Sequence, residues 1–196
     1  FNAADDQSGY SNIVQQDNGA GGSLIIRYNP DNNFRYSLRA GQDGGGITIS
    51  PPSYGVWHHV ALSWNGTYVK AYLNGAEVGN FDVTGTISGQ QPIYIGNWQQ
   101  QEGFSGRIDD VQYWDSGLNQ SQIQSYILTS PTGNEEGLVG YWNFNEGSGD
   151  VIYDQSGNGN NGSINGGAEY STDTPDLLDV ELGEFELLVN GESNIV

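Results

Sequence analysis

The segment "DQSGNGNNG" at 154–162 combines the residue types that bind calcium. Ca²⁺ takes roughly six to eight oxygen ligands, and carboxylates, Asn side chains and loop carbonyls supply them. The glycines after Asp154 let the backbone turn its carbonyls round one ion without a steric cost from Cβ atoms. The spacing differs from an EF-hand loop, because the Asp/Asn positions do not match and no Glu stands at the twelfth position. An Asx-rich turn without metal is the alternative.

The sequence has few residues suited to zinc binding, thiol chemistry or nucleophilic catalysis. His58 and His59 are adjacent, so on a strand their side chains point to opposite faces and cannot share a zinc ion. The chain has no cysteine, which excludes disulfides and thiol chemistry. A nucleophile elbow, a phosphate loop and a dinucleotide fingerprint are all missing from the sequence.

Two hairpins are the clearest structural signal. Asn65-Gly66 and Asn74-Gly75 are each flanked by alternating apolar residues, a pattern that predicts type I′ turns. Turns nine residues apart predict a three-stranded antiparallel meander. Its expected strands are 57–64, 67–73 and 76–83.

One long strand is expected at 104–114, where the apolar alternation breaks phase at Asp109-Asp110. A one-residue bulge at this pair would restore the phase and keep the apolar side chains on one face. Downstream, "LNQSQIQSYILTSP" is the one expected helix, with Asn119 as N-cap and Gln122 completing a capping box. Together these elements predict an all-β protein with a single short helix.

The charge is distributed unevenly along the chain. The net charge is −19, and residues 108–196 hold sixteen carboxylates and no basic residue. Such a surface repels nucleic acid phosphates and anionic membranes, so we expect neither as a partner. No apolar run approaches the roughly 18 residues that membrane insertion as a helix requires.

Residues 10–128 resemble the laminin-G-like module of the concanavalin-A-like jelly-roll superfamily. The family's Trp-x-His-Val-Ala, Tyr-Leu-Asn-Gly, Ile-Gly and Gly-x-Ile-Asp-Asp-Val motifs occur in order as "WHHVA", "YLNG", "YIG" and "GRIDDV". The resemblance implies an all-β, antiparallel β-sandwich of jelly-roll type. Lectins, pentraxins, glucanases and plain spacers share this superfamily, so the fold alone names no ligand.

The segment 137–170 resembles the start of such a module through "GLVGYW", "EGSG" and "DQSGNGNNG". No such opening precedes the first motifs, and we expect the chain to be a piece of a larger protein. Either 137–170 folds back to complete the sandwich, or it begins a second, truncated module. We favour the first alternative, because a lone pair of strands is marginally stable in water. The predicted division is a sandwich at 1–170 and an acidic extension or linker at 171–196.

The resemblance also implies where a structural calcium ion binds. In the family, the Gly-rich loop and the Asp-Asp of the last long strand lie close together at a cation site. The expected ligands are Asp154, Asn158, Asn160 and Asp110, with Asp109 in reserve. Glucanases of the superfamily carry a Glu-x-Asp-x-x-Glu or Glu-x-Asp-x-Glu strand, and "IDDVQYW" lacks both glutamates, so we expect no enzymatic activity.

Loop aromatics are the candidates for ligand binding. Tyr54 and Trp98 lie in Pro-rich or polar loops, where burial is less assured than in a strand. Exposed aromatic faces stack on sugar rings, and neighbours such as Asn97 and Gln99 can bond the hydroxyls. Packing of these aromatics against the edge of the sandwich is the alternative.

These observations predict a non-catalytic binding or adhesion module, secreted or at the cell surface and stabilised by calcium. Its expected partners are a glycan or another cell-surface ligand, and neighbouring modules of the same chain. A structural spacer repeat of a large surface adhesin or filament is the alternative, and a glycoside hydrolase is the least favoured.

Overall fold

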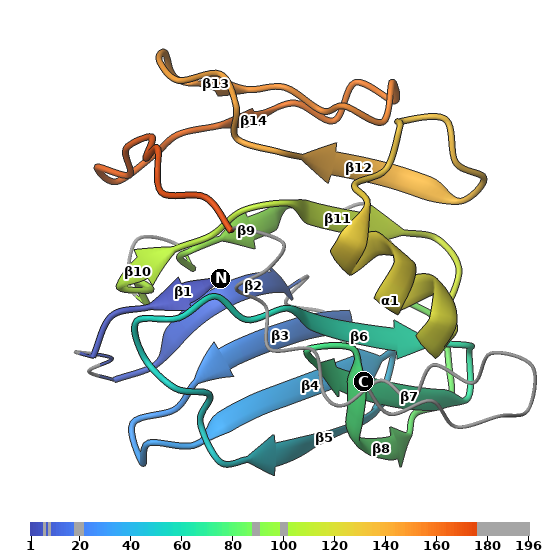
Figure 1. The fold of residues 1–196 in the computed structure, drawn as a ribbon. Coiled ribbons are helices and arrows are strands. Elements are labelled where there is room, and N and C mark those ends of the chain that lie inside the picture. Colours follow the sequence, from blue (N-terminus) through green and yellow to red (C-terminus); the bar gives the residue numbers. More distant parts are fainter. Residues whose placement is uncertain (6, 8, 18–21, 88–90, 99–101, 176–196) are drawn as a thin grey trace, which may run out of the picture.

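Antiparallel strands and one helix make up the computed structural model, which describes residues 1–5, 7, 9–17, 22–87, 91–98 and 102–175 (Figure 1). The larger sheet has five strands in the order β5-β4-β3-β2-β9. Their bounds are β2 Ser11–Asp17, β3 Gly22–Tyr28, β4 Phe34–Ala40, β5 Asp43–Ile49 and β9 Ile93–Ile95.

Alternation of apolar side chains decides which face of this sheet is buried. In β4 every second residue from Phe34 to Ala40 is buried, and the residues between them are half-buried or exposed. Tyr28 stands opposite Phe34, and Ile47 stands opposite Tyr36, so their side chains point to the same face. The opposite face carries Arg35, Ser37 and Arg39 of β4.

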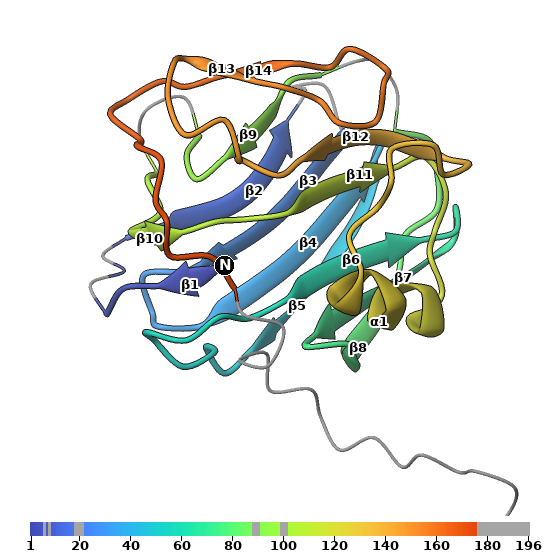
Figure 2. The ribbon, with the colours of Figure 1, turned by 45° about the horizontal axis from the view of Figure 1, so that its top comes forward.

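A second layer of strands lies across the buried face (Figures 1 and 2). It contains the sheet β6-β7-β8 and the antiparallel pair β11-β12. Their bounds are β6 Val60–Trp64, β7 Tyr68–Leu73, β8 Ala76–Asp82, β11 Val111–Trp114 and β12 Leu138–Trp142. Two short pairs complete the strands: β1 Asn2–Ala3 with β10 Gly106–Arg107, and β13 Val151–Ile152 with β14 Gly162–Ser163.

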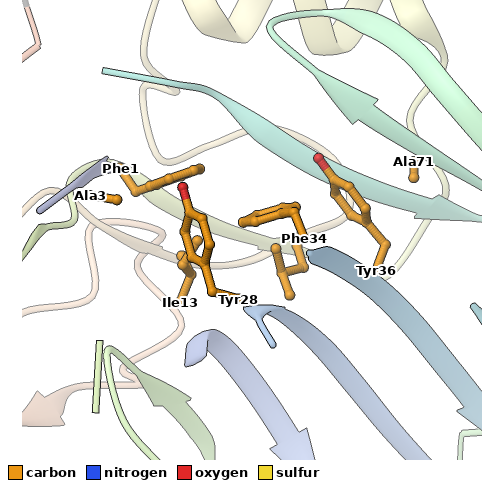
Figure 3. Packing of buried hydrophobic residues seen from close by; sticks show 8 residues of the cluster. Phe1, Ala3, Ile13, Tyr28, Phe34, Tyr36 and Ala71 are labelled. Carbon is orange, nitrogen blue, oxygen red and sulfur yellow. The ribbon is translucent and has the colours of Figure 1, made fainter. Parts of the chain in front are cut away.

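The core lies between the two layers, because each apolar cluster takes residues from both. One cluster joins Tyr28 and Phe34 of the large sheet to Ala71 of β7 (Figure 3). The other joins Leu38 to Val69. Tyr28 and Phe34 meet edge to face with ring centroids 4.9 Å apart. The predicted antiparallel β-sandwich with one short helix is therefore confirmed.

The helix α1, Gln120–Leu128, begins as the sequence predicts. Asn119 is the N-cap, and it forms a reciprocal capping box with Gln122. The side chains of Gln120 and Gln124 both donate to the carbonyl of Gly75, at 3.0 and 3.1 Å. These bonds hold α1 against the β7–β8 hairpin.

The two hairpin turns differ, although both were expected to be type I′. Asn74 and Gly75 have positive φ angles of 50° and 75°, as a type I′ turn requires. At the first turn only Gly66 has a positive φ. There the side-chain Oδ1 of Asn65 accepts hydrogen bonds from the backbone N–H groups of Thr67 and Tyr68. This Asx turn replaces the expected type I′ geometry.

The expected strand at 104–114 is divided in two. β10 and β11 are separated at the Asp109-Asp110 pair, where the phase of apolar residues breaks, and Asp110 has a positive φ of 50°. The phase break was correctly placed, but it ends one strand and begins another, so the single bulged strand was wrong.

The segment after α1 returns to the sandwich. β12 pairs with β11 in antiparallel register from Val111 opposite Trp142 to Trp114 opposite Leu138. This is the pairing that the first of the two alternatives for 137–170 requires, and the folding of 1–170 as one unit stays a prediction. The acidic segment 176–196 lies outside the described residues. Within the described part of the chain, no helix is long and apolar enough to cross a membrane.

The two layers meet closely at β5 and β8, and this contact predicts an effect of mutation. A methyl group at Gly45 would lie 2.7 Å from Cδ2 of Phe81, closer than carbon atoms pack. We expect Gly45→Ala to lower the free energy of unfolding by about 1–3 kcal/mol through overpacking. Gly103→Ala is the matched control, because no atom lies within 4 Å of the added methyl. Equal urea denaturation midpoints for the two variants would show that this contact is not tight.

Candidate functional site

The loop that begins at Asp154 is closed by its own hydrogen bonds. Asp154 Oδ1 accepts from the backbone N–H groups of Tyr141 at 3.0 Å and Ser156 at 2.9 Å, and Oδ2 accepts from Asn160 N–H at 2.9 Å. Burial by itself raises the pKa of Asp154, but the hydrogen bonds from Ser156, Tyr141 and Asn160 outweigh it and lower the pKa. The carboxylate is therefore ionised and ties the loop to β12.

The two asparagines of the loop also bind β12. Asn158 Nδ2 donates to the carbonyl of Leu138 at 2.8 Å, and Asn160 Nδ2 donates to the carbonyl of Val139 at 2.8 Å. The indole N–H of Trp142 donates to the carbonyl of Asn160 at 2.9 Å. The side-chain oxygens of both asparagines stay available for a ligand.

Asp109 and Asp110 lie at the break between β10 and β11. Asp110 Oδ1 accepts a 2.5 Å hydrogen bond from the hydroxyl of Tyr141, and Asp109 Oδ1 accepts from the N–H of Asp110 at 3.0 Å. Burial and the charge of Asp110 raise the pKa of Asp109 to about 6. Asp109 is thus the carboxyl that changes its charge near neutral pH.

Tyr141 separates the two groups of predicted calcium ligands. Its backbone N–H binds Asp154 and its hydroxyl binds Asp110, so the two carboxylates lie at opposite ends of one tyrosine. Among the described residues, no three or more His, Cys, Asp or Glu side chains gather where they could hold a metal ion. The predicted ligands therefore form a loop group of Asp154, Asn158 and Asn160 and a separate aspartate pair, and calcium binding stays a prediction.

The loop aromatics are packed more closely than free binding platforms would be. The ring of Tyr54 stacks on that of Tyr28 with centroids 5.8 Å apart, and its hydroxyl donates to Asn32 Oδ1 at 2.8 Å. Trp98 and Asn97 are half-buried. In the described part of the chain, Trp98 Nε1 and Asn97 Oδ1 are buried without hydrogen-bond partners. Gln99 lies outside the described residues.

A pocket of about 540 Å³ opens between the end of β11, α1 and the turn at 135–137. Its wall contains two aromatic rings, Trp114 and Tyr126, with centroids 5.0 Å apart and planes inclined by 35°. The polar groups that line it include Asp115, Gln122, Glu135 and Glu136.

Local hydrogen bonds fix the polar groups round this pocket. The capping box holds Gln122, because its Oε1 accepts from the N–H of Asn119 at 2.9 Å and leaves Nε2 to donate. Glu135 accepts from the N–H groups of Thr132 at 2.7 Å and Gly133 at 3.0 Å. Burial alone raises the pKa of Glu135, but these hydrogen bonds outweigh it and lower the pKa. Glu135 is thus a poor proton donor.

Sequence reasoning missed this pocket. The available signal was the position of Trp114 at the very end of a strand, directly before the turn residues Asp115 and Ser116. An aromatic at that position lies at the rim of a sandwich, where loops form binding sites.

A family model described as the concanavalin A-like lectin/glucanases superfamily matches residues 1–124. The chain belongs to this superfamily. The resemblance of the motifs round Trp57 and Asp109-Asp110 is thereby confirmed, and it agrees with the sandwich that the structure shows.

Two proteins of known structure are similar to part of the chain. A Bacteroides ovatus protein, named as a candidate carbohydrate binder, is 23% identical with a TM-score of 0.65, covering 84% of this chain and 50% of its own. A heptameric SAP-like pentraxin from Limulus polyphemus is 22% identical with a TM-score of 0.49, covering 61% of this chain and 64% of its own.

A rat relative shares a shorter region with the chain. It is the sushi, von Willebrand factor type A, EGF and pentraxin domain-containing protein 1 of Rattus norvegicus. The two are 29% identical over 102 residues, which is 45% of this chain and 3% of the rat protein. This chain thus spans about half the length of the Bacteroides protein and a small part of the rat protein.

Asp109 predicts a pH dependence of stability. Its pKa in the fold, about 6, is above the ordinary aspartate value of 3.8, so the fold favours the neutral carboxyl. The contribution of this group to stability is therefore full below pH 3.8 and is lost as the pH rises through about 6. Asp109→Asn keeps the acceptor for the Asp110 N–H and removes the charge. We expect the variant to exceed the wild type in unfolding free energy at pH 7.5 and to match it at pH 4, by urea titration in chelator. A variant that is less stable at both pH values would contradict this.

Proposed function

We propose that this superfamily member is a non-catalytic carbohydrate-binding module whose ligand lies in the pocket between β11 and α1. The observation that carries the proposal is the aromatic wall of Trp114 and Tyr126 in a pocket lined by hydrogen-bonding side chains. Ligand sites combine apolar and aromatic walls with a few placed polar groups in this way. The candidate role of the Bacteroides relative in carbohydrate binding supports the same class of ligand.

The pocket suits a sugar in its chemistry. The C–H face of a pyranose is apolar and packs on an aromatic ring, as the faces of Trp114 and Tyr126 allow. Carboxylates accept hydrogen bonds from hydroxyl groups, and the free Nε2 of Gln122 donates to a sugar oxygen. A mono- or disaccharide fits a cavity of about 540 Å³.

Binding without catalysis agrees with the carboxylates of the pocket. Hydrolysis of a glycoside requires one carboxyl with a raised pKa to act as general acid. Glu135 has a lowered pKa and is held by the turn that it caps. Glu135 is therefore suited to accepting hydrogen bonds from a sugar and not to protonating a leaving group.

We place the module outside the cell or on its surface, as an adhesion element. One open site with a stacked ring and a few hydrogen bonds gives a Kd of roughly micromolar to millimolar, about 4–8 kcal/mol. Several copies along one protein would raise the avidity by linking weak sites. The loops at Trp98 and Tyr54 are the alternative site, although the ring of Tyr54 packs on Tyr28, and the glycan experiment separates the two.

The test is a glycan array with the full chain and three variants. We expect Trp114→Ala to weaken binding at least about tenfold, or about 1.4 kcal/mol, and Trp114→Phe to retain most of it because a ring remains. If Trp98→Ala loses glycan binding while Trp114→Ala binds as the wild type does, the ligand site lies at the loop that contains Trp98. A blank array for the wild type would favour a structural spacer, and release of reducing ends would show an enzyme.

We also propose that calcium stabilises the module at the Asp154 loop. The free side-chain oxygens of Asn158 and Asn160, the Gly-rich backbone and the ionised carboxylate of Asp154 are hard donors of the kind that calcium prefers. The ion would hold the loop on β12 as the hydrogen bonds do. Asp109 and Asp110 are a second place at which it could bind.

Melting curves in calcium and in chelator test this proposal. A hundredfold excess of calcium over Kd would add about 2.7 kcal/mol to the stability of the native state. We expect Asp154→Ala to abolish the increment and Asp110→Ala to reduce it, while Asp31→Ala, which removes an exposed carboxylate from another loop, retains it. Asp154→Ala also removes hydrogen bonds and so lowers the melting temperature without calcium. For each variant we therefore compare the gain in stability on adding calcium, and not the melting temperature itself. Identical curves for the wild type in calcium and chelator would end the proposal.

A further inference from the structure

The outer face of the large sheet carries three of the chain's five basic residues. Arg27 lies on β3, and Arg35 and Arg39 lie on β4. In β4 they alternate with the buried Tyr36 and Leu38, so their side chains leave the sheet on the side away from the core. In a protein with a net charge of −19, this face is a local concentration of positive charge.

Two of these arginines stand directly opposite each other. The register of β3 and β4 pairs Arg27 with Arg35, and like charges in such a pair destabilise a sheet. The structure compensates Arg27 alone. Its guanidinium lies 3.5 Å from Glu102, donates to Asn29 Oδ1 at 3.0 Å, and covers the ring of Tyr10 at 4.0 Å.

Arg35 and Arg39 have no carboxylate partner among the side chains that the structure describes. The three ion pairs found there are Arg27–Glu102, Lys70–Glu77 and Arg107–Asp173. Asp43, at the start of β5, binds the N–H and hydroxyl of Thr84 instead. Among the described side chains these two guanidinium groups are without ion pairs, which leaves their charge available to a ligand.

The neighbouring strand makes this face flat. Gly44 and Gly46 of β5 stand opposite Arg39 and Ser37 on the outer side. A methyl group at Gly46 would lie 2.9 Å from Nη2 of Arg35, and one at Gly44 would lie 3.2 Å from Cβ of Arg39. The arginine side chains therefore extend over a strand that has no side chains of its own there. A glycine run in a strand marks a place where another group approaches the backbone closely.

We propose that this outer face of β3, β4 and β5 binds an anionic carbohydrate, with Arg35 and Arg39 recognising its carboxylate or sulfate groups. A guanidinium binds such planar or tetrahedral anions through two parallel hydrogen bonds. Arg35 and Arg39 are four residues apart on one strand, or about 13 Å, so they would contact two charges along an extended polymer.

The composition of the face favours a hydrophilic polymer over a protein. Protein interfaces depend on large apolar or aromatic anchors. The exposed large apolar residues of the described chain are Tyr10, Val56, Leu128, Val151 and Tyr153, and none belongs to β3, β4 or β5. Of these five, Tyr10 contacts this face through Arg27.

This site is distinct from the pocket of the proposed function, although its class of ligand rests on the same superfamily. The pocket is lined by residues of β11 and α1. Figure 2 shows that these two elements lie away from the outer face of β3, β4 and β5. Trp114→Ala should therefore leave binding of polyanions unchanged, so that failure of either proposal can be recognised separately.

The experiment measures binding of the full chain to polygalacturonate, dextran sulfate and neutral dextran at 0.15 M salt. At this ionic strength the Debye length is about 8 Å, so the acidic remainder of the protein is largely screened from the face. We expect binding to one or both of the polyanions and none to dextran. Polygalacturonate alone would identify carboxylate as the recognised group, and dextran sulfate alone would identify sulfate.

Arg35→Gln/Arg39→Gln should lose at least about tenfold in affinity, and Arg107→Gln, an arginine outside this face, is the matched control. The double variant should melt no lower than the wild type, because Arg35→Gln relieves the repulsion with Arg27. Equal affinity of the double variant and the wild type would overturn the proposal. The proposal would also be overturned if the wild type bound neither polygalacturonate nor dextran sulfate. Binding of poly-glutamate as tight as that of the two polysaccharides would overturn it too, because it would show a site for acidic polypeptide.

Discussion

The position of Tyr141 between two carboxylates is the constraint on which the C-terminal part of the structure depends. Its backbone N–H binds Asp154 and its hydroxyl binds Asp110. The first bond ties the Gly-rich loop to β12, and the second ties β12 to the start of β11. The turn at 135–137 lies at the other end of this strand pair, where Trp114 stands opposite Leu138 and the N–H of Asp115 donates to the carbonyl of Gly137 at 2.9 Å. The pairing of β11 with β12 therefore places the turn beside Trp114 at the pocket.

The sandwich separates its charges as well as its layers. The large sheet contributes aromatic and aliphatic residues to the core on one face and arginines on the other. The carboxylates of the pocket belong to the chain after residue 107, where no basic residue occurs. A neutral sugar at the pocket and an anionic one at the arginine face would meet opposite local potentials, although the whole molecule is strongly acidic.

Features governed by local rules could be predicted from the sequence. The capping box of Asn119 and the type I′ turn at Asn74-Gly75 depend on a few neighbouring residues, and both were placed correctly. The first hairpin turn differs because the side chain of Asn65 offers its backbone a competing hydrogen-bond acceptor. The pocket was not predicted, because the end of a strand marks only the position of Trp114, and its contact with Tyr126 forms only when α1 folds back across the end of β11. The hydrogen bonds of Tyr141 likewise join residues far apart in sequence.

Native-state hydrogen exchange of the Tyr141 amide tests the central claim, that β12 and its loop belong to the same cooperative unit as the sandwich. This amide donates to Asp154, so it exchanges only when that bond opens. The account predicts that its free energy of exchange equals that of the most protected amides in β3 and β4, within the global stability of about 5–15 kcal/mol. Exchange of the Tyr141 amide through a local opening, while β3 and β4 stay protected, would contradict the claim and show that residues 137–163 form a separate unit.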